Sequence, residues 1–163
     1  MLAAKDGARA NASYILSKSG EYLNKDFTME LMFHFEKQRD GIAFVGLGAV
    51  DPGGAYNEPV NTVHLRMHPP YVSNGEIGLT KLPVNSGVGL GKFRSLGPHR
   101  IVIEKKGRSV TFGVDINNTG KIEDEYQKTI PDIRAFAPFL NGKNTFLFFG
   151  GGGTYERIRL IEK

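Results

Sequence analysis

The stretch FTMELMFHFE, residues 27–36, decides the fold class, because apolar side chains recur at every second position. The apolar set is Phe27, Met29, Leu31, Phe33 and Phe35. Successive side chains of a β-strand point to opposite faces, so this spacing predicts a long strand with one buried face. We therefore expect these five residues to be buried, and Glu30, His34 and Glu36 to be more exposed.

Similar alternation continues along the chain and predicts eight to eleven short strands. GIAFVGLGAV (41–50) follows a charged turn, and we expect it to form a hairpin with the first strand. VHLRMH (63–68) and EIGLTKL (76–82) are typical of half-buried strands. HRIVIEKKGRSVTFGVDIN (99–117) predicts a hairpin that turns at Lys106-Gly107.

The C-terminal part predicts one helical turn and two further strands. PDIRAFAPFL (131–140) has Ile133, Phe136 and Leu140 at helical spacing, with Pro131 before them. NTFLFFGGGG (144–153) and YERIRLIEK (155–163) read as strands, joined where the glycines allow a bulge or a tight sheet corner. The longest irregular stretches are expected at 51–61 and 83–98, and loops of that length are often functional.

Length and composition fit a single all-β domain over residues 1–163, with a core from about 14 to 162. The chain has 163 residues, 21 of them glycine, and no cysteine, which excludes disulfides and thiolate metal sites. No apolar run approaches the ~20 residues of a membrane span, so we expect no membrane insertion. The net charge of +4 is spread along the chain, whereas a nucleic-acid site needs a clustered basic stripe, so we expect no nucleic-acid partner.

Three segments resemble the concanavalin A-like lectin/glucanase superfamily and its laminin-G-like relatives. They are YLNKDFTMELMFHFE (22–36), the central hairpin (99–117) and FLFFGGGGTYERIRLIE (146–162). The resemblance spans roughly Tyr14 to Glu162 and implies an antiparallel β-sandwich of jelly-roll type. Members of this superfamily include glycoside hydrolases, lectins, carbohydrate-binding modules and adhesion modules, so the fold alone does not define the function.

VDINNTGKIEDEY (114–126) concentrates carboxylates and amides around a Thr119-Gly120 turn, and it has three interpretations. The first is a glycosidase centre, since retaining enzymes place two carboxyl groups ~5 Å apart. Superfamily hydrolases carry a Glu-x-Asp-x-Glu or Glu-x-Asp-x-x-Glu run, whereas this chain has three consecutive carboxylates at 123–125 and no tryptophan. We therefore expect no hydrolase active site and no catalytic residue.

The second interpretation is a calcium site made by Asp115, Asn117 and Glu123. A helix-flanked calcium loop that began at Asp115 would need a bidentate Glu at its twelfth position, where this chain has Tyr126. The third interpretation, a polar β-hairpin connection, explains the same residues with ordinary turn chemistry. We favour the hairpin and expect no cofactor, with calcium as the alternative.

The strand at 63–68 supplies the candidate ligand surface, because His64, Arg66 and His68 share one face. The two histidines are ~13 Å apart on a strand, too far to share a metal ion. One interpretation is an ordinary solvent-facing surface. The other is a sugar- or peptide-binding face, to which Tyr56, Asn57 and Tyr71 add a stacking ring and amide contacts from neighbouring loops.

Together these observations predict a non-catalytic binding module, with ligand-binding residues Tyr56, Asn57, His64, Arg66 and His68. Carbohydrate is the favoured ligand, and an extracellular or cell-envelope location is favoured, with the module as one part of a larger protein. The alternative is a laminin-G-like module that binds a protein ligand, and a glycoside hydrolase ranks third.

Overall fold

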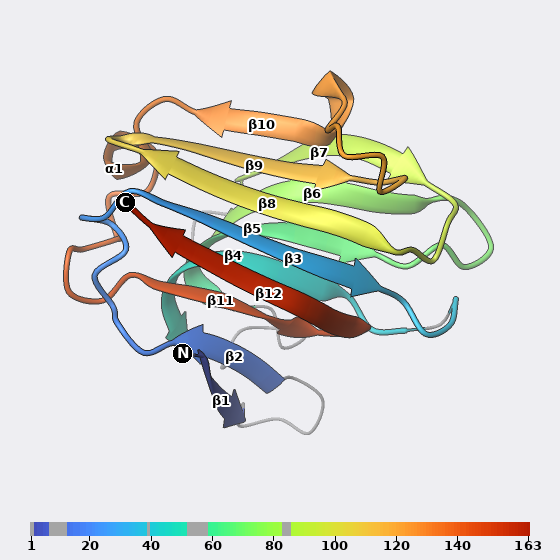
Figure 1. Ribbon diagram of the computed structural model, residues 1–163, viewed down its shortest axis with the longest axis horizontal. Helices are drawn as coiled ribbons and strands as arrows, with labels where there is room; N and C mark the ends of the chain where they lie inside the picture. The colour runs from blue at the N-terminus through green and yellow to red at the C-terminus, as the bar shows by residue number, and fades with distance from the viewer. Residues whose placement is uncertain (1, 7–12, 39, 52–58, 83–85) are drawn as a thin grey trace.

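The computed structural model describes residues 2–6, 13–38, 40–51, 59–82 and 86–163. Within these residues, twelve strands form two antiparallel sheets that lie face to face (Figure 1). The seven-stranded sheet has the order β1 (Leu2–Asp6), β2 (Ser13–Ser17), β11 (Phe146–Gly151), β4 (Ala43–Asp51), β5 (Val60–His68), β6 (Gly75–Leu82) and β7 (Ser86–Phe93). The five-stranded sheet has the order β10 (Gln127–Ile130), β9 (Ser109–Asp115), β8 (His99–Lys106), β3 (Phe27–His34) and β12 (Thr154–Glu162). This is the predicted β-sandwich.

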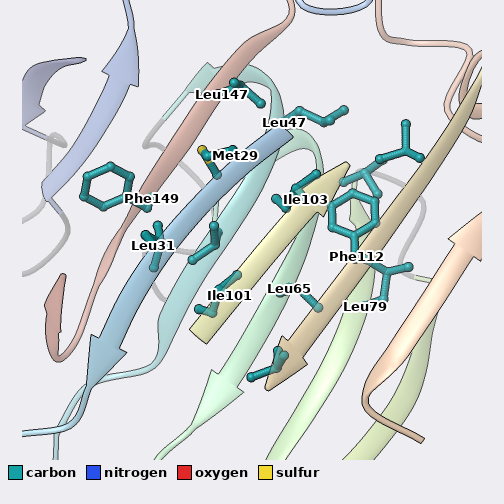
Figure 2. Packing of buried hydrophobic residues seen from close by; sticks show 14 of the residues in the cluster. Met29, Leu31, Leu47, Leu65, Leu79, Ile101, Ile103, Phe112, Leu147 and Phe149 are labelled. Carbon is teal, nitrogen blue, oxygen red and sulfur yellow. The ribbon is translucent and has the colours of Figure 1, made fainter. Parts of the chain in front are cut away.

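The core lies between the sheets and follows the period-2 pattern of the sequence (Figure 2). The five apolar residues from Phe27 to Phe35 are all buried, while Glu30 and His34 are half-buried and Glu36 is exposed. From the opposite sheet, Leu47, Leu65, Leu79 and Leu147 pack into the same cluster. The prediction for β3 is therefore confirmed, and the β-sandwich follows from burying one face of each sheet.

The predicted hairpin between β3 and β4 is wrong, because the two strands lie in different sheets. β3 pairs with β8 and β12, and β4 pairs with β11 and β5. Both edges of β3 are thus occupied, and the charged segment after it carries the chain from one sheet to the other. Alternation predicts that a strand exists, but it does not choose the strand's neighbours.

The predicted hairpin of β8 and β9 is confirmed, with Arg100 paired to Asp115 and Lys106 to Ser109. The hairpin interpretation of the next stretch is also confirmed, since β10 pairs antiparallel with β9 from Gln127↔Gly113 to Ile130↔Val110. The connection between β9 and β10 is longer than a tight turn and includes the 3₁₀ helix η2 (Asp124–Tyr126).

The stretch 83–98, expected to be irregular, contains β7, an edge strand that pairs with β6. The sequence SGVGLGKF did not predict this strand, because three of its residues are glycines, which have low strand propensity. Most of the other expected loop, 51–61, lies outside the described residues.

The glycines near the C-terminus form the predicted tight corner, where the chain leaves β11 in one sheet and enters β12 in the other. Gly151 and Gly153 have φ of +86° and +78°, values that L side chains rarely adopt. A Cβ at Gly152 would collide with the Gly41 carbonyl group, and one at Gly153 with the Phe33 ring.

The expected helical turn is α1 (Ile133–Phe136), which begins after Pro131. Asp132 caps it, since the carboxylate accepts hydrogen bonds from the backbone N–H groups of Arg134 and Ala135. No helix among the described residues is both long and apolar enough to cross a bilayer.

Candidate functional site

β5 separates its side chains into two environments. Val63, Leu65 and Met67 belong to the core between the sheets. His64, Arg66 and His68 therefore project from the outer face of the seven-stranded sheet. The pairing register places His64 beside Gly46 and Thr80, Arg66 beside Phe44 and Gly78, and His68 beside Glu76.

His64 does not lie at a ligand-accessible surface, which corrects its predicted place in the ligand site. Its side chain is fully buried, and its ring lies 5.4 Å from Phe44 and 6.2 Å from Phe148 between ring centroids. Tyr14 completes this second, smaller aromatic cluster. The missing side chain at Gly46 gives the imidazole room, since a Cβ there would lie 2.6 Å from the His64 Cβ.

A hydrogen-bond chain fixes the orientation of the His64 ring. The Thr62 hydroxyl donates to the Pro59 carbonyl oxygen at 3.0 Å. Its oxygen also lies within hydrogen-bond distance of His64 Nδ1, at 2.8 Å. His64 is thus a structural residue that joins β5 to the aromatic cluster.

Arg66 and His68 line an open hollow of about 370 Å³ over β5, β6 and β7. We call it the sheet-face hollow, and its main side chains are Arg66, His68, Glu76, Thr80, Val88 and Lys92. Tyr56 and Asn57 lie outside the described residues. Tyr71 is exposed in the turn between β5 and β6 and is not among the residues that line the hollow.

Glycines create the sheet-face hollow. Gly78, Gly87 and Gly89 line it, and a Cβ at any of them would contact no other atom closer than 3.6 Å. The sheet there has no side chains to fill the space, so the backbone itself forms a floor.

Glu76, Thr80 and Lys92 are site residues that the sequence analysis missed. The alternation of EIGLTKL places Glu76 and Thr80 on one face of β6 and could have indicated them, whereas Lys92 is in the strand that the glycines concealed.

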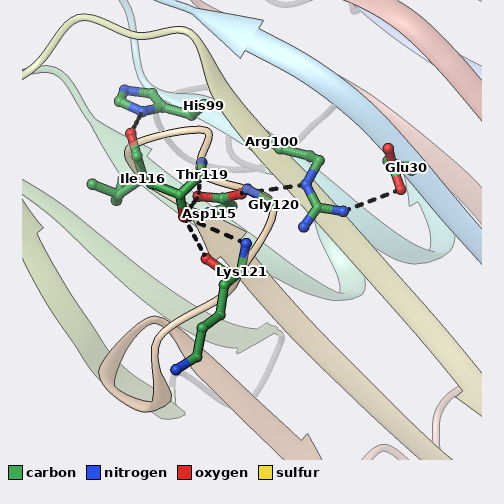
Figure 3. Close-up of polar contacts among 8 residues, drawn as sticks. All are labelled: Glu30, His99, Arg100, Asp115, Ile116, Thr119, Gly120 and Lys121. Atoms are coloured by element: carbon green, nitrogen blue, oxygen red, sulfur yellow. Dashed lines mark hydrogen bonds and ion pairs between the residues drawn. The ribbon is translucent and has the colours of Figure 1, made fainter.

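Asp115 organises the turn that follows β9 (Figure 3). Its carboxylate accepts hydrogen bonds from the backbone N–H groups of Thr119 at 3.0 Å and Gly120 at 2.7 Å. Arg100 Nε lies 3.5 Å from the same carboxylate. Burial alone would raise the Asp115 pKa, but the two N–H donors and the Arg100 charge outweigh it and lower the pKa below its ordinary value.

This arrangement disfavours a calcium ion at Asp115. Both carboxylate oxygens already accept hydrogen bonds, and the Arg100 guanidinium would repel a cation. Asn117 and Glu123 are exposed and line the same small hollow as Asp115. No cluster of three His, Cys, Asp or Glu side chains that could hold a metal occurs among the described residues, although this set does not include the Asn117 amide. The carboxylates at 123–125 lie in the β9–β10 connection, all exposed, rather than along a strand.

The fold is an antiparallel β-sandwich of the concanavalin A-like, jelly-roll type. No protein-family model matches the chain, and no curated protein sequence matches it. Solved structures match along nearly the whole chain, at sequence identities that are evidence for the fold alone.

Three similar structures illustrate the class. The exoplasmic/lumenal domain of VIP36 in its Ca²⁺/Man2-bound form has a TM-score of 0.62 at 13% identity, over 99% of this chain and 74% of that one. The enzymatically active domain of bacteriophage CBA120 tailspike protein 2 has a TM-score of 0.58 at 15% identity, over 98% of this chain but 27% of that one. The alginate lyase from Klebsiella pneumoniae has a TM-score of 0.53 at 11% identity, over 85% of this chain and 60% of that one. The chain thus spans about a quarter of the tailspike domain.

Proposed function

We propose that this protein is a carbohydrate-binding module whose ligand occupies the sheet-face hollow. The observation that carries the proposal is the hollow itself, an open space with a glycine floor and hydrogen-bonding side chains at its sides. Arg66 and Lys92 provide donors, Glu76 provides an acceptor, and Thr80 provides both. Sugar hydroxyl groups need this mixture, because each is both a donor and an acceptor.

The glycine floor suits a flat ligand. A sugar ring can lie against Gly78 and Gly89 without a side chain in its way, and Val88, which is 48% exposed, offers an apolar edge. The volume of about 370 Å³ is in the usual range for small-molecule sites.

We propose binding without catalysis, because glycosidases use a pair of carboxyl groups and Glu76 is the one carboxylate among the described residues that line the hollow. The names of the similar structures support a carbohydrate ligand, since the VIP36 domain was solved with mannose ligands. Two other structures belong to an enzymatically active tailspike domain and an alginate lyase, so the experiment includes an assay for polymer breakdown.

We also propose an extracellular or lumenal setting, as for the VIP36 exoplasmic/lumenal domain. A lectin-like module meets glycans there, on a cell surface or on secreted polymers. Calcium is not part of the proposal, because the Asp115 carboxylate already has hydrogen-bond and ion-pair partners.

A glycan array with the full chain tests the function, followed by titration of the best glycan against Arg66→Ala and Lys92→Ala. Arg94→Ala and Lys128→Ala are the matched controls, since each removes an exposed cation that does not line the hollow. We expect the first pair to weaken binding and the controls to bind as the parent does. Shortening of an acidic or neutral polysaccharide by the parent chain would instead identify an enzyme. Binding to protein ligands but to no glycan would favour the laminin-G-like alternative.

A further inference from the structure

A second hollow, of about 410 Å³, is lined by residues of the β8–β9 turn, of α1 and of the segment before β3. The β8–β9 turn and α1 lie at the same end of the sandwich (Figure 1). We call it the end hollow, and its polar lining comprises Asn24, Asp26, Lys105, Gly107, Arg108 and Arg134. Three of these side chains are cationic and one is anionic. None of them belongs to the sheet-face hollow.

Lys105 reaches the end hollow from inside the sandwich. It continues the core-facing row of Ile101 and Ile103 on β8, and its side chain is only 3% exposed. Its ammonium group donates to the Gly107 carbonyl oxygen at 2.6 Å and lies 3.6 Å from Asp26 Oδ1. An ammonium has three N–H donors, and among the described residues these two oxygens are its partners. One donor is therefore left for a ligand.

Burial and the nearby Arg134 charge both lower the Lys105 pKa, and they outweigh the opposing effect of Asp26. A bound anion would compensate the burial of this positive charge.

Arg134 is held at the end hollow by neutral partners. Its guanidinium donates to Asn24 Oδ1 at 2.8 Å, and the Asn24 amide in turn donates to the Gly142 carbonyl oxygen at 3.1 Å. No carboxylate of the described residues forms an ion pair with Arg134. The guanidinium is thus positioned without being neutralised.

Arg108 is positioned from the other side of the end hollow. Its guanidinium pairs with Asp132 at 3.0 Å, and its carbonyl oxygen accepts a hydrogen bond from Ile133 N at 2.9 Å, which ties α1 to the β8–β9 turn. Asp26 is partly occupied as well, since it accepts the Gly107 N–H at 2.8 Å. Three cations face two carboxylates, Asp26 and Asp132, so the end hollow keeps a net positive charge.

We propose that the end hollow is an anion site that binds a sulfate or carboxylate group through Lys105, Arg108 and Arg134. The shared chemistry is a compact oxyanion, which guanidinium groups bind by paired N–H donors. Such a group comes either from a free inorganic ion or from an acidic sugar. The site is independent of the proposed function, so a failure of one proposal does not affect the other.

NMR titration of the ¹⁵N-labelled chain tests the site, with the Gly107 amide as reporter. Sodium sulfate, glucuronate and neutral glucose are added in parallel at constant ionic strength. We expect saturable shifts with sulfate or glucuronate and none with glucose. If glucuronate binds more tightly than sulfate, an acidic sugar is the ligand, and the reverse order identifies a free ion.

Arg108→Ala and Arg134→Ala should each raise the dissociation constant by about threefold, because each removes one exposed charge contact with the anion. Arg94→Ala, which removes the same charge elsewhere, and Arg66→Ala in the sheet-face hollow should leave it unchanged. Lys105→Met should abolish saturation, and circular dichroism checks that this variant is folded. Shifts that stay linear, or that weaken equally in Arg94→Ala, would overturn the proposal, because they would report charge screening alone.

Discussion

Asp115 and Arg100 face each other across the β8–β9 ladder, with 3.5 Å between Asp115 Oδ2 and Arg100 Nε and an Asp115 side chain that is 1% exposed. Arg100 also reaches Glu30 on β3, 3.3 Å from its carboxylate. The pair therefore connects the β9 turn to the outer face of the five-stranded sheet, and this connection explains the acidic and amide-rich stretch better than a metal does.

Replacing Asp115 with alanine should lower the free energy of unfolding by about 2–4 kcal/mol, because it leaves the N–H groups of Thr119 and Gly120 and the Arg100 charge without their acceptor. Asp115→Asn keeps one acceptor oxygen and should cost less. Asn117→Ala, an exposed neighbour, should stay within about 0.5 kcal/mol of the parent. Urea unfolding measures all three, and an equal loss in Asn117→Ala would refute the role of Asp115.

Calcium should not change the melting temperature, because Asp115 has no free oxygen to offer a cation. A ligand that binds the folded state stabilises it by mass action. Thermal unfolding with millimolar calcium and with a chelator therefore shows whether calcium binds the folded chain. A calcium-dependent rise that disappears in Asp115→Asn would restore the calcium interpretation.

Stability should fall as the pH drops below about 6.5, the ordinary pKa of histidine, because of His99. Burial lowers the His99 pKa and outweighs the Ile116 and Ser95 carbonyl oxygens, 2.7 and 3.1 Å from the ring nitrogens, which favour the charged form. The folded state thus takes up the proton at a lower pH than the unfolded state does. Between the two pKa values the unfolded state binds more protons, so stability rises with pH there and reaches its full value above the unfolded pKa.

One such group contributes a slope of at most about 1.4 kcal/mol per pH unit. Urea midpoints between pH 7.5 and pH 5 measure this slope, which should flatten in His99→Gln. The carboxylates with lowered pKa, including Asp115, titrate well below this window and do not interfere. An unchanged slope in His99→Gln would show that another group is responsible.

Gly153→Ala should be more destabilising than Gly120→Ala, although both glycines have positive φ, +78° and +89°. The shared backbone strain costs about 1–2 kcal/mol. A Cβ at Gly153 also collides with the Phe33 ring in the core, whereas nothing lies within 4 Å of one at Gly120. Thermal unfolding of the two variants measures this steric cost. Equal decreases in melting temperature would show that the backbone around Gly153 adjusts to the extra methyl group without further cost.

Arg66→Ala should weaken binding of an identified glycan by about 1–3 kcal/mol, the range of a hydrogen bond to a charged group. We expect a smaller effect on stability, because Arg66 is half-buried on the outer face and lies outside the core. Isothermal titration together with thermal unfolding separates the two effects. Unchanged affinity would remove Arg66 from the proposed site.

The ligand-site prediction from sequence was partly wrong for a physical reason visible at β5. Alternation correctly placed His64 and Arg66 on the face opposite Leu65. It could not show that Phe44 on β4 and Phe148 on the distant strand β11 would enclose His64 while leaving Arg66 at a hollow. Positions on the outer face of one sheet differ in burial, because the side chains on the neighbouring strands decide whether a given residue is covered or exposed.

The sequence by itself determined the fold class, the buried face of β3, the β8–β9 hairpin and the glycine corner, because each depends on local periodicity or backbone freedom within a few residues. Only the tertiary structure decided that β3 and β4 belong to different sheets, that β7 forms a glycine-rich edge, and that Lys105, Arg108 and Arg134 meet at one end. The first and the last of these features depend on contacts between distant segments, whereas β7 pairs with the preceding strand β6 and was missed because of its glycines. Period-2 alternation specifies which face of a strand is buried, but many pairings bury the same face equally well.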